Sequence, residues 1–330
     1  MSKPSLLRRI FGGIWSAITW IRLALANILF LVMLAFIYFV YFGGSPEPLP
    51  EKAALLLNPM GTIVDQKSPV DPLQALLAEP SPADNEVLLR DVIEAIELAQ
   101  EDDSINSLVM QLDYLMYVGI SRGQEIVTAL EAFRASGKPI VAVADVYTQD
   151  QYLLASYADE LIANPMGGVA LEGFSIYQNY FSEALEKLSV SMHIFRAGQH
   201  KSAVEPLQRT DMSEGEKEVA MAWLSDLWSN YTGIVEGNRE LAAGAVDDYV
   251  NGFAARMTSG DGDAAKVALD IGLVDQLLTR SQANDYLAEL VGARNKDGIY
   301  EAVPFEKYLS RKRPLRTSLD AQPRVAVITA

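Results

Sequence analysis

The stretch that decides the fold runs from Pro139 to Ala163. It opens with Pro139-Ile-Val-Ala-Val-Ala144, continues through Gln151-Tyr-Leu-Leu-Ala-Ser-Tyr-Ala158 and closes with Glu160-Leu-Ile-Ala163. The first and last segments are almost continuously apolar, as strands are in a sheet that is covered on both faces. The middle segment predicts a helix around residues 150–158. A strand, a helix and a second strand with short connections predict a parallel β-α-β unit.

The same alternation extends to both sides of this unit. We expect further strands at 53–57, 107–112 and 190–195, and helices at 86–100 and near 179–188. Ser121 with Gln124, and Ser213 with Glu216, have the spacing of capping boxes that open two more helices. A helix over 263–271 is expected to stop at Gly272. The chain is therefore predicted to be an α/β protein with a largely parallel sheet.

The helix after Ser213 carries a broad apolar stripe. Its members are Ala220, Trp223, Leu224, Leu227, Trp228 and Tyr231. Such stripes are usually buried against another element, so core or an oligomer interface is the simpler interpretation. A hydrophobic groove for peptides is the functional alternative.

The N-terminal region predicts a membrane anchor. Residues 23–42 contain no charged residue, and 20 residues of helix span a hydrocarbon core of about 30 Å. Residues 1–22 carry four basic residues and no acidic one, which places the short N-terminus in the cytoplasm and the rest outside. A cleaved signal peptide is the alternative, but the run ends in bulky residues rather than a small-residue cleavage site.

The composition excludes several classes of protein. The 330 residues include no cysteine and only two histidines, His193 and His200, which excludes disulfide scaffolds, thiolate enzymes and histidine-rich metal sites. The net charge is −16, and all four basic residues of the anchor region lie before residue 23. The remainder is therefore strongly acidic, which disfavours nucleic acid as a partner.

The domain boundaries follow from these features. A proline-rich linker is expected at 43–52, the main domain at 53–322, and a short apolar strand at 323–330. This last strand resembles the opening strand at 53–57. We interpret it as the first strand of a second repeat that this chain lacks, with a strand completing the domain's own sheet as the alternative.

A single lysine stands out as a candidate catalytic residue. It lies in Phe195-Arg-Ala-Gly-Gln-His-Lys201-Ser-Ala-Val-Glu205-Pro-Leu-Gln-Arg209-Thr-Asp211-Met-Ser213. A lysine that follows a buried strand and borders small apolar residues can be partly desolvated, which favours the neutral form that a general base needs. A solvated surface lysine is the simpler alternative.

These residues resemble the long form of the bacterial signal peptide peptidase SppA, also called protease IV. The resemblance includes the anchor, Ser136-Gly-Lys-Pro139, Ala163-Asn-Pro165, the Lys201 motif and Gly272-Leu-Val-Asp275. It implies a fold of the ClpP/crotonase type behind one transmembrane helix, and it covers only the N-terminal of two related halves. In that family the lysine is the general base of a Ser-Lys dyad.

The chain departs from the family at the nucleophile. An alignment on Ala163-Asn-Pro165 places Gln149 at the serine position, and glutamine cannot attack a carbonyl. The expected glycine pair of the oxyanion loop is replaced by Asp113-Tyr-Leu-Met-Tyr-Val-Gly119. Ser156 and Ser202 are weak substitutes, because neither has a visible oxyanion loop. The resemblance then implies half an active site, with the serine and oxyanion hole in a missing C-terminal half.

The implied function is degradation of released signal peptides at the bacterial inner membrane. The resemblance implies hydrophobic peptide substrates, a single-pass protein with its bulk in the periplasm, a homo-oligomer and no cofactor. The 330-residue chain alone would be inactive. A non-catalytic membrane-anchored scaffold of the same fold is the main alternative. A crotonase-type acyl-CoA enzyme is a further one, which the export anchor disfavours because coenzyme A is cytosolic.

Overall fold

The computed structural model describes residues 6–42, 49–69, 85–195, 197–198, 201–259 and 262–313. The chain divides into two units, Met1–Pro48 and Leu49–Ala330. The predicted strand at 323–330 and most of the predicted linker at 43–52 lie outside the described residues. Those two predictions therefore stay predictions.

The described part of the first unit is one long helix, α1 (Leu6–Phe42). Its stretch Gly13–Phe39 has a mean hydropathy of 2.3 and is long and apolar enough to cross a membrane. At 1.5 Å per residue, 27 residues reach about 40 Å, more than a hydrocarbon core requires. The apolar stretch thus starts ten residues before the predicted boundary at residue 23, because the residues from Gly13 to Ile21 continue the same helix without charge.

The second unit is built on a six-stranded parallel sheet in the order β8-β7-β6-β4-β1-β9. Its strands are β1 (Ala53–Leu57), β4 (Ile105–Gln111), β6 (Ile140–Thr148), β7 (Glu160–Ala170), β8 (Gln276–Leu277) and β9 (Ala302–Pro304). All the described pairings in this sheet are parallel. The α/β class with a largely parallel sheet is thereby confirmed.

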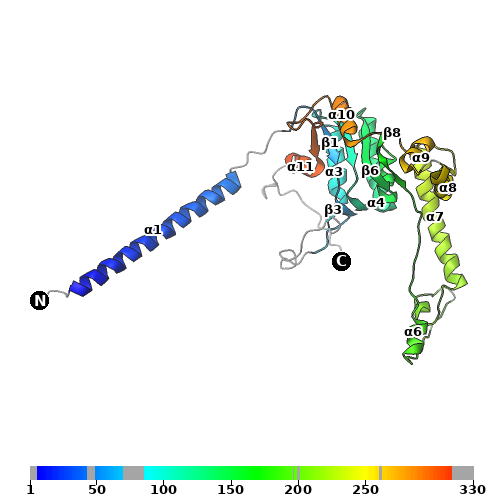
Figure 1. The fold of residues 1–330 in the computed structure, drawn as a ribbon, viewed down its shortest axis with the longest axis horizontal. Coiled ribbons are helices and arrows are strands. Elements are labelled where there is room, and N and C mark those ends of the chain that lie inside the picture. Colours follow the sequence, from blue (N-terminus) through cyan, green and yellow to red (C-terminus); the bar gives the residue numbers. More distant parts are fainter. Residues whose placement is uncertain are drawn as a thin grey trace, which may run out of the picture. The chain divides into compact units, whose positions relative to one another are not determined.

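Helices cover both faces of this sheet, as its apolar strands require. On one face, Leu55, Leu108 and Ala142 pack with residues of α3 (Leu89–Gln100), α4 (Ile120–Ala135), α5 (Gln149–Ala155) and α11 (Phe305–Lys312). On the other face, Val109 and Val141 pack with α10 (Arg280–Val291). Helices lie on both faces of the sheet (Figure 1), and neighbouring residues of one strand pack into opposite cores.

A second, smaller sheet is formed by strands that alternate with those of the first in the sequence. Its strands are β2 (Gly61–Val64), β3 (Glu86–Leu88) and β5 (Leu115–Tyr117), in the order β3-β2-β5 and parallel. In this sheet as described, β5 has a neighbouring strand on the β2 side alone. β5 is therefore an edge strand of this sheet, and its Leu115 carbonyl accepts the Gln151 side chain at 2.9 Å.

A partly buried polar cluster fastens α11 to the rest of the domain. The Asp102 carboxylate accepts hydrogen bonds from the Tyr308 hydroxyl at 2.8 Å and from the Ser104 backbone N–H at 3.0 Å. Lys312 Nζ lies 2.6 Å from the same carboxylate. Burial alone would raise the pKa of Asp102, but the hydrogen bonds from Lys312, Ser104 and Tyr308 outweigh it and hold that pKa well below its usual value.

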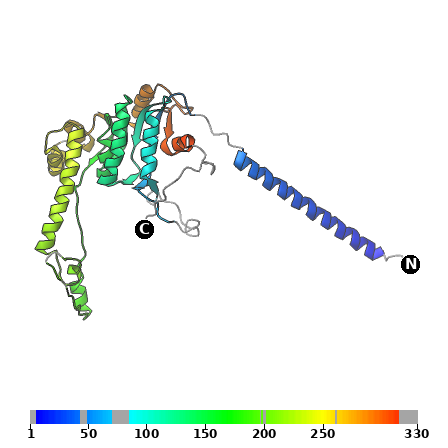
Figure 2. The ribbon, with the colours of Figure 1, turned by 180° about the vertical axis from the view of Figure 1, so that it is seen from behind.

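The segment after β7 leaves the sheet and forms an arm. It comprises α6 (Ser182–Lys187), the short 3-10 helix η2 (Glu205–Leu207) and the first turns of α7 (Glu214–Asn238). Its far end packs α6 against η2, whereas α7 reaches back to α5 and to α8 (Ala245–Ser259). Figures 1 and 2 show α6 beyond the end of α7, away from the sheet.

Two local predictions are wrong. The expected strand at 190–195 is absent from the described arm, where Val190, Met192 and Phe195 are exposed and the segment joins neither sheet. The helix expected to open at Ser121 instead begins at Ile120 behind Gly119, which adopts φ +73° and takes the N-cap position without a side-chain cap. The Ser213 cap is confirmed, since its hydroxyl accepts the Glu216 N–H.

Candidate active site

The candidate base Lys201 lies in the arm, between α6 and η2. Its side chain is exposed in this chain. The buried strand that was expected to deliver it is absent from the described arm, so the prediction that the strand desolvates the lysine is wrong for the chain by itself. The apolar alternation at 190–195 is present, but the described arm provides no neighbouring strand to cover it.

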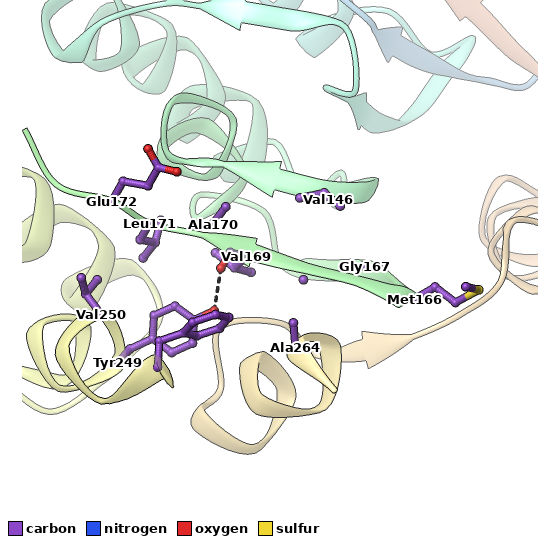
Figure 3. A pocket seen from close by; sticks show the side chains of 12 residues that line it. Val146, Met166, Gly167, Val169, Ala170, Leu171, Glu172, Tyr249, Val250 and Ala264 are labelled. Atoms are coloured by element: carbon purple, nitrogen blue, oxygen red, sulfur yellow. Dashed lines mark hydrogen bonds between the residues drawn. The ribbon is translucent and has the colours of Figure 1, made fainter. Parts of the chain in front are cut away.

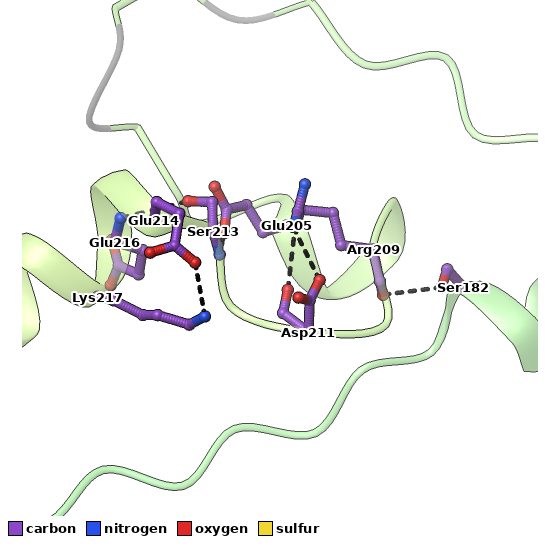
Figure 4. Close-up of polar contacts among 8 residues, drawn as sticks. All are labelled: Ser182, Glu205, Arg209, Asp211, Ser213, Glu214, Glu216 and Lys217. Carbon is purple, nitrogen blue, oxygen red and sulfur yellow. Dashed lines mark hydrogen bonds and ion pairs between the residues drawn. The ribbon is translucent and has the colours of Figure 1, made fainter.

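The turn that carries Lys201 is anchored by a buried carboxylate (Figure 4). Glu205 is 4% exposed, and its Oε2 accepts the backbone N–H of Ser213 at 3.1 Å. The Glu205 N–H donates to the Ser202 carbonyl at 2.8 Å, which closes the turn directly after the lysine. A charged acceptor at a helix N-terminus is favourable because the helix dipole is positive there. Glu205 thus joins the lysine turn to the start of α7.

A second set of contacts joins the same turn to α6. The Ser182 hydroxyl donates to the Arg209 carbonyl at 2.7 Å, and the Phe181 N–H donates to the Pro206 carbonyl at 2.7 Å. Arg209 also pairs with Asp211 at 2.8 Å (Figure 4). The lysine turn is therefore held from both sides, and Lys201 itself is exposed.

The position predicted for a nucleophile lies elsewhere, at the end of β6. Gln149 is the first residue of α5. Its side-chain oxygen accepts the Gly173 N–H at 2.8 Å and the Glu172 N–H at 3.2 Å, and its amide donates to the Gly173 carbonyl at 3.3 Å. Gln149 therefore fastens the chain after β7 to the start of α5, which is a structural role.

The loop at 113–119, which replaces the oxyanion loop of the family, has a partner within the chain. The backbone N–H groups of Val118 and Gly119 donate to Oδ2 of Asp150, at 2.9 and 3.3 Å. Two adjacent N–H groups on one oxygen form the arrangement that stabilises an oxyanion. In this chain the negative oxygen that these two N–H groups bind is Oδ2 of Asp150.

The two substitute serines have structural contacts. Ser156 is 1% exposed, donates to the Leu153 carbonyl at 2.8 Å and accepts from the Asn238 side chain at 3.1 Å. Ser202 contributes its carbonyl to the lysine turn. No described hydrogen bond joins either serine to the N–H groups of Val118 and Gly119.

The place where Gln149 and Asp150 meet the loop at 118–119 is called the cleft below. The lysine turn and this cleft lie at different places along α7. Ser213 caps the start of the helix, and the Tyr231 hydroxyl donates to the Gln149 carbonyl at 2.9 Å. Eighteen residues of helix separate Ser213 from Tyr231, a rise of about 27 Å. A base must lie within about 3 Å of the nucleophile that it activates. The lysine turn is therefore anchored far from the Gln149 position of its own chain.

A family model fits the region that contains both places. The model named Peptidase family S49 matches residues 132–294. Protease 4 of Haemophilus influenzae is 33% identical over 322 residues, and protease 4 of Salmonella typhi is 34% identical over 327 residues. These alignments cover 95% and 97% of this chain and 52% of each relative.

The chain therefore contains a region of the peptidase family S49 type, residues 132–294. The resemblance to the SppA type of protease is thereby confirmed. The chain spans about half the length of the curated relatives that it matches. The S49 match includes Gln149, Asp150, Lys201 and Glu205.

Comparison of this S49 chain with solved structures gives two further similarities. A mutant of a membrane-bound stomatin-specific protease covers 77% of this chain and 94% of its own, with 11% identity and a TM-score of 0.38. An enoyl-CoA hydratase/isomerase family protein from Silicibacter pomeroyi covers 62% and 69%, with 15% identity and a TM-score of 0.34.

A separate apolar pocket of about 340 Å³ lies beside β7 in the S49 domain (Figure 3). β8 pairs only with Ile162 and Ala163, so the outer edge of later β7 residues faces α8 and α9 (Ala264–Ile271). The Tyr249 hydroxyl donates to the Val169 carbonyl at 2.6 Å across this pocket. A Cβ at Gly167 would lie 1.7 Å from the Asp145 carbonyl oxygen, which explains the glycine.

Sequence reasoning found Lys201 and Gln149 but missed Glu205 and Asp150. A glutamate directly before a proline, inside an otherwise apolar turn, was the available signal for Glu205. Asp150 had no signal, because its partners are backbone groups 31 and 32 residues away. Among the described residues, no group of three or more His, Asp or Glu side chains could hold a metal ion.

Proposed function

We propose that this chain is the lysine-donating part of a membrane-anchored Ser-Lys endopeptidase that degrades released signal peptides. Lys201 is the general base in this proposal. The serine and its oxyanion hole come from a segment that is not part of this chain, as the 52% coverage of the protease 4 relatives suggests.

One observation carries the proposal: the Lys201 turn is anchored about 27 Å along α7 from the cleft of its own sheet. A lysine whose turn is fixed on an extended arm is suited to activate a nucleophile that another surface supplies. The cleft at Gln149 needs no such lysine, because its two oxyanion-type donors already bind Asp150.

The chemistry follows from the residue types. A neutral lysine accepts the proton of a serine hydroxyl, the serine oxygen bonds to a peptide carbonyl carbon, and two N–H donors stabilise the oxyanion. The lysine then returns the proton to the leaving amine, and water hydrolyses the acyl-enzyme by the same route. Burial favours the neutral form of a lysine. Because Lys201 is exposed here, the surface that supplies the serine must also cover it.

Exposed apolar residues on the arm support such a covering surface. Tyr177 is 92% exposed, Leu188 72% and Phe195 97%, all between β7 and η2. An exposed apolar patch is typical of an interface, and we propose that these side chains contribute to one. We propose that a neighbouring subunit or the remaining half of the protease covers it in a homo-oligomer.

The membrane anchor supports the substrate class and the location. α1 is long enough to span a bilayer, and the four basic residues within 1–22 favour a cytoplasmic N-terminus with the S49 domain in the periplasm. Released signal peptides are apolar and remain in the bilayer. A protease anchored in the bacterial inner membrane meets them there.

A non-catalytic scaffold is the second candidate, and a specific observation favours it. Asp150 and Gln149 fill the positions at which this fold would otherwise place an oxyanion and a nucleophile. If no other segment supplies a serine, the chain would bind and assemble without cleaving.

The test uses the polypeptide as its source cells make it. A native mass near twice 36.2 kDa would fit the proposal, and a mass of 36.2 kDa would favour the scaffold unless a separate subunit carries the serine. In the native protein, Lys201→Ala is expected to abolish peptide hydrolysis. Lys201→Arg should fail equally, because arginine keeps the charge but does not act as a base at neutral pH. Lys187→Ala, an exposed control on α6, should retain activity. Full turnover by Lys201→Ala would refute the assignment.

A further inference from the structure

The largest of the hollows described in the S49 domain lies at the cleft that Asp150 fills. It encloses about 680 Å³ between the loop after β5, the start of α4, and α7. Its walls include Tyr117, Phe174, Trp223 and Tyr231, and this hollow is called the aromatic groove below. Trp223, Leu227 and Tyr231 belong to the apolar stripe of α7 that the sequence analysis left open between core and groove.

Part of the aromatic wall is rigid and part is accessible. The rings of Trp228 and Tyr231 stack at 5.5 Å, and Phe174 meets Tyr231 edge-on at 6.3 Å. Tyr231 is buried, whereas Trp223 and Tyr117 are 45% and 53% exposed. Fixed aromatic rings beside accessible ones are typical of surfaces that bind apolar side chains.

The shape of the lining makes a peptide the suitable occupant. The aromatic groove reaches from Tyr117, the last residue of β5, to Trp223 and Tyr231 of α7. Pairing with β5 is not used, because the Leu115 N–H donates to the Leu112 carbonyl and the Leu115 carbonyl accepts the Gln151 side chain. The apolar side chains of the peptide therefore supply its contacts with the aromatic wall.

The charges of the groove select the peptide. Asp65, Glu125 and Asp150 line it, against one guanidinium, that of Arg122. Arg122 Nε pairs with Asp65 at 2.9 Å, and Asp150 binds the Val118 and Gly119 N–H groups. The lining therefore carries a net charge of two negative units from these four side chains, which favours a basic residue in the ligand.

We propose that the aromatic groove is a second peptide site, which binds apolar segments containing a lysine or arginine and does not cleave them. Binding uses Trp223 and the acidic lining. Cleavage does not follow, because Asp150 occupies the two N–H donors and Gln149 replaces a nucleophile. This proposal is independent of Lys201 and of any serine from outside the chain.

The experiment measures binding of a fluorescein-labelled nonapeptide of leucine and phenylalanine with one central lysine to the full chain in detergent. A matched peptide carries glutamate at the central position. The lysine peptide should bind about 10-fold more tightly at ~20 mM salt, and under about 3-fold more tightly at ~0.5 M salt, because salt screens exposed charges.

Two variants of α7 separate the groove from the micelle and from the rest of the helix. Trp223→Ala should weaken binding at least about 10-fold, as loss of an aromatic anchor does. Met221→Ala is the control, since Met221 is 61% exposed on the same helix and does not line the groove. Partition into the detergent is common to both variants, so the difference between them reports the groove.

Three results would overturn the proposal. They are equal affinity for the two peptides at low salt, equal loss in the two variants, and mass spectrometry that finds the bound peptide cut. Lys201→Ala should bind like the original chain. Failure of the protease proposal would therefore leave this result unchanged, and the reverse also holds.

Discussion

Removal of the Glu205 carboxylate should loosen the lysine turn without unfolding the domain. Glu205 is 4% exposed and accepts the N–H of Ser213, the N-cap residue of α7. In Glu205→Ala that N–H loses this charged acceptor, which costs about 1.5–3 kcal/mol for a hydrogen bond to a charged group. Glu205→Gln keeps the shape and an oxygen acceptor, so about half of that cost is expected.

The expected effect is local because the turn lies in the arm. α6 and η2 contact each other and the start of α7, whereas the cores of the sheet involve other residues. A local destabilisation of 1.5–3 kcal/mol speeds hydrogen exchange by about 10- to 150-fold where exchange occurs by local opening. Amides at residues 205–216 should therefore exchange faster, and those of β6 should not.

Hydrogen exchange with mass spectrometry on the full chain in detergent measures this directly. Glu216→Gln is a matched control, because the described cap contact of Glu216 uses its backbone N–H rather than its carboxylate. Unchanged exchange at 205–216 in Glu205→Ala would refute the anchoring argument. Equal acceleration in β6 would show that Glu205 supports the whole domain instead.

Two further predictions concern stability. Gly167→Ala should lower the free energy of unfolding by several kcal/mol and reduce soluble yield, because its Cβ would lie 1.7 Å from the Asp145 carbonyl oxygen. Gly233→Ala in α7 meets nothing within 4 Å and should stabilise the chain by about 0.5–1 kcal/mol. Equal melting temperatures for the two variants would contradict this. Asp102→Asn should destabilise by about 2 kcal/mol at neutral pH, because the carboxylate loses its charged bond to Lys312. The pKa of Asp102 is lowered in the folded chain, so this stabilisation is present above the unfolded pKa of about 4 and is lost as the pH falls through the folded pKa. Urea titrations of the original chain and of Asp102→Asn from pH 7 to pH 2 should show their difference in unfolding free energy shrinking. A constant difference would exclude the mechanism.

The sheet was predictable from the sequence because its information is local. The run Ile140–Ala144 is apolar on both sides, and such a run is stable only as an interior strand. Gly272 ends α9 in the left-handed conformation, as its position after the helix predicted. In both cases a few consecutive residues decide the outcome.

The arm and the cleft depend on contacts between distant parts of the chain. Residues 190–195 alternate like a strand, but a strand forms only where another strand pairs with it, and the sequence does not reveal that this segment lies away from the sheets. Asp150 is an ordinary first-turn acid in sequence, and only the fold brings the loop at 118–119 to it. Lys201 was identified from its motif, and its catalytic role stays a prediction.

The length of α7 sets a mechanical requirement for the lysine turn. The helix is held by α5 and α8 toward one end and carries the turn at the other, about 27 Å from Tyr231. A tilt of about 5° at the held end displaces the far end by roughly 2 Å, and a misplacement of 1 Å in a catalytic group can cost about 100-fold in rate. A small tilt of the helix is therefore enlarged at its far end. A substitution near Tyr231 is expected to change the position of Lys201 without altering the turn itself.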